Sequence, residues 1–154
     1  MRIHGGFLGQ DGGDEILLDT YGSATHSIES TEIELAGLSA CGVDLSYPAT
    51  LIGRGITVTA NNTDVLINSN RITQTSYSGI STAGGIVQIG GNNIRLNGAA
   101  GLSGELSGIF VLGGNYMMTG NSINGNPIGV LLHTDNHLIN GNNITQNSAL
   151  CLLF

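Results

Sequence analysis

Tryptophan and lysine are absent from this 154-residue sequence, and it contains only two prolines and two cysteines. Charged residues make up 10% of the chain, and its net charge is −7. Binding of nucleic acid needs clustered cations, so we expect no nucleic-acid partner. Cys41 and Cys151 have neither CxxC nor Cys/His spacing. We therefore expect buried thiols, no disulfide framework, no metal site and no cofactor.

Long hydrophobic runs are also missing. The longest apolar run, Ala149–Phe154, is far too short to span a bilayer, so we expect no membrane insertion. No basic segment precedes an apolar run at the N-terminus, so the sequence shows no signal-peptide pattern. Hydrophobic residues nevertheless make up 40% of the chain, in short runs, which argues against disorder.

Glycine and asparagine are abundant, at 25 and 16 residues, and they recur too often for helices over most of residues 50–150. Residues 115–126 are repeated 21 positions later at 136–147, and the same register places residues 129–132 over 150–153. The identical pairs are Asn115/Asn136, Gly120/Gly141, Asn121/Asn142, Ile123/Ile144 and Asn126/Asn147. Two less regular copies can also be aligned. Residues 109–115 match residues 86–92, and residues 65–72 match residues 116–123.

This repeat predicts short parallel strands stacked in about five coils, with equivalent residues ~4.8 Å apart. The predicted asparagine ladder is Asn70, Asn121 and Asn142. The predicted core stacks are Ile67, Met118 and Ile139, extended by Leu96, and Ile72, Ile123 and Ile144. Residues 1–27 depart from the repeat and are expected to form an N-terminal cap or an irregular first turn. Residues 28–154 are expected to form the stacked coils.

The pattern Asn-x-x-Ile-x-x-Asn-x-Ile, followed by a small turn and Gly-Ile or Gly-Val, resembles the right-handed parallel β-helix of pectate lyases, polymannuronate epimerases and bacteriophage tailspikes. The resemblance covers roughly residues 30–154 and implies an all-β, right-handed parallel β-helix (β-solenoid). It is greatest to tailspikes, which implies a structural, homotrimeric domain of a phage virion that contacts host surface polysaccharide. Localisation on the virion, or outside the cell, follows from the same resemblance.

Two other functions stay open. The chain fits a fragment of a lyase, epimerase or glycoside hydrolase acting on an acidic polysaccharide, or a secreted adhesin-like solenoid without catalysis. Leu150, Leu152, Leu153 and Phe154 would lie at an open end of the coils, so either the natural protein continues or another chain covers that end.

Whether the protein is an enzyme depends on its carboxylates. Glycoside hydrolysis uses two carboxyl groups, and Glu32 and Glu34 alternate about Ile33, which places both on the outer face of one strand. With Asp44 they are the candidate catalytic residues of a depolymerase; the alternatives are half of a calcium site or a solvated strand face. The Asp-Pro-His motif of the epimerases and the arginine and calcium-aspartate set of pectate lyases are not recognisable.

The candidate ligand-binding residues are Tyr47, Tyr77 and Glu105. The two tyrosines lie in predicted turns, where they would either stack on a sugar or pack over a loop. Irregular insertions around residues 77–85 and 100–107 are the expected places for ligand recognition. His133, Asp135 and His137 form the densest cluster of titratable groups, with a metal or acid/base role as one interpretation. His137 occupies the position of Ile94 and Tyr116, which favours a semi-exposed spacer instead.

Overall fold

The computed structural model describes residues 2–4, 16–21, 25–34, 53–61, 64–98, 106–134 and 137–152, and within them every regular element is a β-strand. The strands are β1 (Arg2–His4), β2 (Ile16–Tyr21), β3 (Thr25–Glu29), β4 (Glu32–Glu34), β5 (Ile56–Asn61), β6 (Asp64–Asn68), β7 (Arg71–Thr73), β8 (Ile80–Gly90), β9 (Asn93–Arg95), β10 (Ser107–Thr119), β11 (Ser122–Asn124), β12 (Ile128–Leu132), β13 (His137–Asn140), β14 (Asn143–Thr145) and β15 (Ala149–Leu152).

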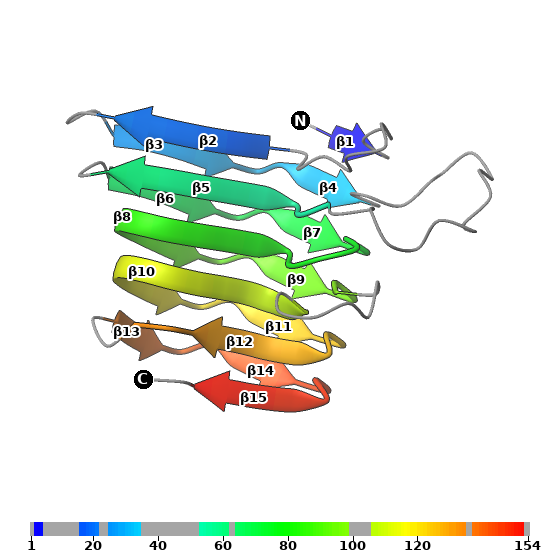
Figure 1. The fold of residues 1–154 in the computed structure, drawn as a ribbon. Coiled ribbons are helices and arrows are strands. Elements are labelled where there is room, and N and C mark those ends of the chain that lie inside the picture. Colours follow the sequence, from blue (N-terminus) through cyan, green and yellow to red (C-terminus); the bar gives the residue numbers. More distant parts are fainter. Residues whose placement is uncertain are drawn as a thin grey trace.

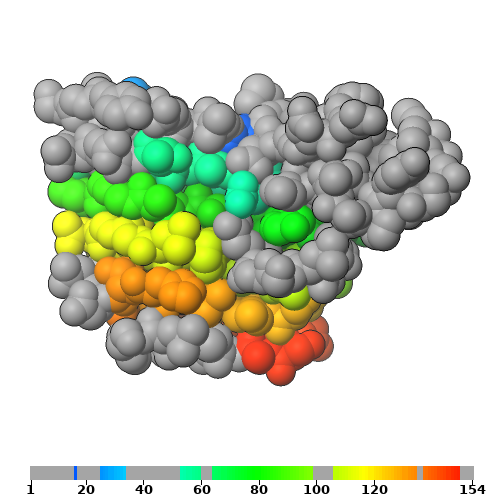
Figure 2. Space-filling model, viewed as in Figure 1, coloured from blue at the N-terminus to red at the C-terminus, as the bar shows by residue number. Residues whose placement is uncertain are grey.

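The strands form two parallel sheets, an arrangement compatible with a β-solenoid (Figure 1). One sheet has the order β1-β4-β7-β9-β11-β14. The other has the order β15-β12-β10-β8-β5-β2, with β3, β6 and β13 attached to the same sheet. Successive segments of the chain lie in layers from one end of the stack to the other, as the colour bands of Figure 2 show. The all-β, parallel part of the prediction is confirmed.

The long strands β8 and β10 bend at paired glycines. The first half of β8 pairs with β5 and its second half with β6. Gly84 and Gly85 at the bend have φ values of 79° and 75°, and Gly114 of β10 has 109°. A Cβ atom on Gly114 would lie 2.8 Å from the backbone of Gly84, so only glycine fits there. The bend gives the nine-stranded sheet two outer faces.

Stacks of apolar side chains fill the inside of the coils, because every second residue of a strand points inward, and two of these stacks contain the predicted core residues. The first stack consists of Ile28, Ile67, Ile89, Met118 and Ile139, and the second of Ile33, Ile72, Ile94, Ile123 and Ile144. Both predicted stacks are confirmed. The prediction that Leu96 extends the first stack is wrong, since Leu96 is 42% exposed at a corner with φ of 57°, and Ile89 takes that place.

Besides the bend at the paired glycines, the coils have two corners, and both use a left-handed residue followed by asparagine or threonine. At the first corner Ser30, Ser69, Gly91, Gly120 and Gly141 precede Thr31, Asn70, Asn92, Asn121 and Asn142. At the second corner Gln74, Leu96, Gly125 and Gln146 precede Thr75, Asn97, Asn126 and Asn147. The left-handed conformation reverses the chain locally, and the following polar side chain stacks on its equivalents in the neighbouring coils.

Hydrogen bonds of Asn121 show how the first ladder works. Its Oδ1 accepts from the backbone N of Asn92 at 3.0 Å and from Nδ2 of Asn92 at 2.9 Å. Its Nδ2 donates to the carbonyl of Ile89 and to Oδ1 of Asn142, both at 2.8 Å. Asn121 is 1% exposed, so these bonds compensate the burial of its amide. The predicted ladder is confirmed, with Asn92 as a further member.

A second ladder, not predicted, repeats this pattern from Thr75 through Asn97 and Asn126 to Asn147. The identity of Asn126 and Asn147 in the repeat was its signal in the sequence. Partners in the first ladder are 39, 22, 29 and 21 residues apart, so the coils differ in length. The extra residues of the longer coils lie between the short strand of one coil and the short strand of the next. The corners at either end of the short strands therefore stay in register.

Glycine is also required where the chain enters β5, β8, β10 and β12 of the large sheet. Gly55, Gly79, Gly108 and Gly129 occupy equivalent positions. A Cβ atom on Gly108 would lie 2.8 Å from both the carbonyl oxygen of Gly129 and Cγ2 of Ile123. The Gly-Ile and Gly-Val pairs of the repeat therefore mark a close approach between consecutive coils.

Two predicted alignments are wrong. Residues 109–115 lie over β8 from Ile80, not over residues 86–92, because the two Gly-Gly pairs have different roles: Gly113 pairs with Ala83 at the bend, whereas Gly90 pairs with Thr119 before a corner. At the C-terminal end the 21-residue register holds for Ile128 and Ala149 and then shifts, so Leu132 pairs with Leu152 rather than with residue 153.

Strands β1 and β2 lie within the segment predicted as a cap or irregular first turn, and β3 runs across its predicted boundary. β1 pairs with β4, and β2 pairs with β5, both in parallel. The boundary between residues 27 and 28 stays a prediction. Within the described residues, β1 and β2 are the last strands at this end of their sheets.

Candidate functional site

The outer surface of the six-stranded sheet carries two straight rows of side-chain positions, which we call the polar face. They flank the inward isoleucines of the second stack. One row is Glu32, Arg71, Asn93, Ser122 and Asn143, and the other is Glu34, Thr73, Arg95, Asn124 and Thr145. The registers are direct, so neighbours within a row are one strand spacing apart, ~4.8 Å. Every position of both rows holds a residue whose side chain has hydrogen-bond donors or acceptors.

Charge on this face is concentrated toward the N-terminal coils. Arg71 forms an ion pair through Nη1 with Oε1 of Glu32, and the side chains are 44% and 34% exposed. Such a pair contributes at most about 1 kcal/mol to stability. Arg95, one strand further along, is exposed. Thr73, its register partner, is 2% exposed and its hydroxyl has no hydrogen-bond partner.

The predicted catalytic carboxylates are located only in part. Glu32 and Glu34 lie on the same strand with Ile33 buried between them, as the alternation predicts. The side chain of Glu34 and all of Asp44 lie outside the described residues, so the catalytic set stays a prediction. Sequence reasoning missed Arg71 as the partner of Glu32, because the two are 39 residues apart.

Tyr77 lies at the corner between β7 and β8 and is partly exposed. The guanidinium carbon of Arg54 is 6.0 Å from the centroid of the Tyr77 ring, at the outer limit of a cation–π contact. Tyr47 and Glu105, the other predicted ligand-binding residues, lie outside the described residues. The expected insertion at 77–85 is wrong in its second part, because residues 80–85 belong to β8.

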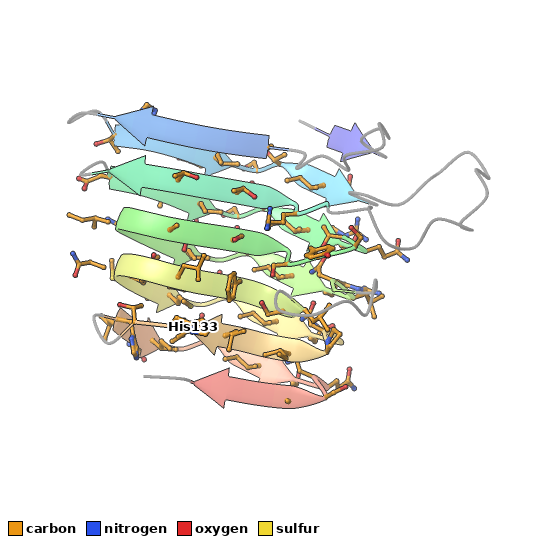
Figure 3. The ribbon with its side chains drawn as sticks, in the orientation of Figure 1. His133 is labelled. Carbon is orange, nitrogen blue, oxygen red and sulfur yellow. The ribbon has the colours of Figure 1, made fainter. Side chains whose placement is uncertain are left out.

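The two described histidines of the predicted cluster lie on different elements. His133 follows β12, where it is exposed and meets the ring of Phe110 edge-on, with 5.5 Å between centroids (Figure 3). His137 begins β13 and pairs with Tyr116, as predicted; Ile94 belongs to the other sheet and is not its equivalent. Asp135 lies outside the described residues. Among the residues described, no group of three or more acidic, histidine or cysteine side chains is placed to hold a metal ion.

A second outer surface, formed by β6, β13 and the C-terminal halves of β8 and β10, carries exposed apolar side chains among its polar ones. Ile86, Met117 and Leu138 on it are 48%, 36% and 56% exposed. They line a shallow groove of about 310 Å³ together with Gln88 and Asn115. Sequence reasoning did not identify this groove, because the outward positions of residues 86–89 and 115–118 hold both polar and apolar residues. Its lining offers little hydrogen bonding, so it suits an apolar contact rather than sugar recognition.

Tyr116 lies inside the coil beneath this groove. It is 4% exposed, and burial raises the pKa of its hydroxyl above 10.0, an effect partly opposed by the nearby Thr82 hydroxyl and the backbone of Gly113 and Gly84. Neither the Tyr116 nor the Thr82 hydroxyl has a hydrogen bond of good geometry. The two hydroxyl groups are too enclosed to act on a polymer.

No family model, curated protein or solved structure matches this chain. The interpretation of the polar face therefore rests on its own geometry. The described residues form no helix of the length and apolar character needed to cross a membrane.

Proposed function

We propose that the chain is a right-handed parallel β-helix domain, similar to those of phage tailspikes, which contacts host surface polysaccharide through its polar face. The observation that carries this proposal is the pair of polar rows along six parallel strands. Their amide, hydroxyl, carboxylate and guanidinium groups match the donors and acceptors that sugar hydroxyls offer. They project from a rigid sheet, so ordering them on binding costs less entropy than ordering a loop.

Polymer binding fits this face better than it fits the groove. An extended polysaccharide presents hydroxyl groups at regular intervals, and the rows repeat at ~4.8 Å over their whole length. Arg95 is exposed and has no ion-pair partner among the described residues, so its planar guanidinium can bind a carboxylate or a pair of hydroxyls.

Binding without cleavage is favoured over a depolymerase. Glycoside hydrolysis uses two carboxyl groups, and among the described side chains of the polar face Glu32 is the only carboxylate. Release of new reducing ends or unsaturated sugars from a polysaccharide by the purified chain, abolished in Glu32→Gln, would show the enzyme instead.

The binding test uses isothermal titration with a panel of neutral and acidic bacterial surface polysaccharides. Arg95→Ala and Asn124→Ala, on the polar face, should each weaken binding of the recognised polysaccharide by about tenfold, equivalent to ~1.4 kcal/mol. Gln88→Ala on the second outer surface is the matched control and should leave affinity unchanged. No binding to any polysaccharide, or equal loss in the control, contradicts the proposal.

The virion location and the homotrimer are proposed from the same resemblance. Sedimentation equilibrium of the purified chain addresses the assembly directly: three chains per particle supports the tailspike-like arrangement, and a monomer supports an adhesin-like solenoid.

A further inference from the structure

Asparagine followed directly by glycine occurs three times in the sequence, at Asn97/Gly98, Asn124/Gly125 and Asn140/Gly141. In such a pair the backbone nitrogen of the glycine can attack the side-chain amide carbon of the asparagine and close a five-membered succinimide ring. Glycine favours this attack because it has no Cβ atom to hinder the approach. The first two pairs follow β9 and β11, which both lie between other strands of their sheet, and the structure gives them different surroundings.

The pair Asn97/Gly98 is held on both sides. The Asn97 side chain is 1% exposed, and its Oδ1 accepts from the N–H and the hydroxyl of Thr75, at 3.1 and 2.9 Å. Its Nδ2 donates to Oδ1 of Asn126 at 3.2 Å. The N–H of Gly98 donates to the carbonyl of Thr75 at 2.9 Å. Ring closure at this pair would first have to open the second ladder.

The pair Asn124/Gly125 has neither restraint. Asn124 is the last residue of β11, and its half-buried side chain belongs to the polar face. Its Nδ2 donates to Oγ of Ser122 at 3.4 Å, which is longer than the usual range of such a bond. The N–H of Gly125 has no hydrogen-bond partner among the described residues, whereas the equivalent N–H of Leu96 donates to the carbonyl of Asn124 at 3.2 Å. Both reacting groups are therefore loosely held.

We propose that Asn124 is a site of spontaneous deamidation, with the backbone nitrogen of Gly125 as the internal nucleophile. This nitrogen bonds to Cγ of Asn124, its proton passes through water to the leaving group, and the Cγ–Nδ2 bond breaks to release ammonia. Water then opens the ring at either carbonyl and leaves aspartate or isoaspartate. A local opening precedes the attack, because the carbonyl of Asn124 accepts from the N–H of Leu96 and from Nδ2 of Asn126, both at 3.2 Å.

The new carboxylate would lie beside Arg95. Asn124 and Arg95 are direct register partners on the neighbouring strands β11 and β9. Glu32 and Arg71 have the same relation on β4 and β7, and there the carboxylate and the guanidinium form an ion pair. Deamidation would therefore occupy the exposed guanidinium of Arg95 and withdraw it from a bound polymer. This consequence rests on the proposed function, whereas the modification itself does not.

The modification is tested on the full chain without any polysaccharide. The protein is incubated at mildly alkaline pH, folded or in urea, and peptide mapping by mass spectrometry follows the conversion of amide to acid at Asn124 and Asn97. We expect Asn124 to react at least about tenfold faster than Asn97 in the folded protein, and both to react at similar rates in urea. Equal rates in the folded protein, or reaction of Asn124 only in urea, would overturn the proposal.

The matched control is Asn124→Gln, whose longer side chain cannot close the five-membered ring. This variant should lack the rapidly formed acidic species of the folded protein. Persistence of that species at the same rate would assign it to another residue and would also overturn the proposal.

The effect on Arg95 has two further tests. The guanidinium NMR signals of Arg95 should shift in Asn124→Asp, and added salt should reduce the shift. Asn124→Asp should bind an acidic polysaccharide about tenfold more weakly than Asn124→Ala, and most of this difference should vanish in the Arg95→Ala background. Unchanged guanidinium signals, or equal binding by the two variants, would overturn the proposed regulation. If no polysaccharide binds any variant, the proposed function fails, whereas the deamidation rates and the guanidinium shift still test the modification and the ion pair.

Discussion

Removal of one interior ladder amide should destabilise the protein far more than removal of an outward amide next to a ladder. Asn121→Ala takes away the oxygen that accepts two N–H groups of Asn92 and the donor to the carbonyl of Ile89. All of these groups are buried inside the stack, and each unpaired one costs about 1–3 kcal/mol. Allowing for water that enters the space left by the side chain, we expect a loss of about 3 kcal/mol in the free energy of unfolding.

The matched control is Asn143→Ala, which removes the same side chain from an exposed position on the polar face. Its expected effect is within about 0.5 kcal/mol. Urea denaturation followed by circular dichroism gives both values, and an unchanged m-value would show that the compactness of the end states is the same. A loss below about 1 kcal/mol for Asn121→Ala, or equal losses for both variants, would refute the role assigned to the ladder.

Further predictions concern close packing, alkaline stability and surface charge. Gly108→Ala should cost at least ~3 kcal/mol by denaturation because its Cβ would overlap the neighbouring coil, whereas Gly120→Ala, with φ of 64° and open space, should cost about 1 kcal/mol. Because the pKa of Tyr116 is raised in the folded state, the unfolded state loses that proton first, so stability falls as pH rises above 10.0; thermal melts of Tyr116→Phe should show a smaller alkaline loss, and an unchanged loss would contradict this assignment. Glu32→Gln should change stability by less than about 1 kcal/mol, since the ion pair with Arg71 is solvent-exposed, and a larger loss would indicate a structural role for the pair.

The sequence predicted the fold best where equivalent residues have one structural role. Asn121 and Asn142 match in the repeat because both occupy the same corner, and the isoleucine two residues later always points inward. The alignment of the Gly-Gly pair in β10 with the pair at residues 90–91 was wrong, because the pair in β10 lies at a bend and the other lies at a corner. The prediction that Leu96 lies in the core was wrong because leucine rarely adopts the left-handed conformation, whereas its apolar side chain suggests a buried position.

The sequence predicted which side of the strand carries the site residues, but not the contacts between them. Alternation about Ile33 placed Glu32 on the outer surface, but its contact with Arg71 depends on the length of an intervening segment that no periodicity specifies. The apolar groove at Met117 was missed for a related reason, since an outward methionine and an inward one look alike in a short apolar run.

The most direct test of the proposed function is a side-chain NMR titration of the ¹⁵N-labelled, ¹³C-methyl-labelled chain with the polysaccharide that it binds. Contact through the polar face predicts shifts of the Arg71 and Arg95 guanidinium signals and of the Asn124 amide, with the Met117 methyl signal unchanged. Shifts at Met117 and in the apolar groove, with the arginine signals unchanged, would contradict the assignment of the polar face as the binding surface.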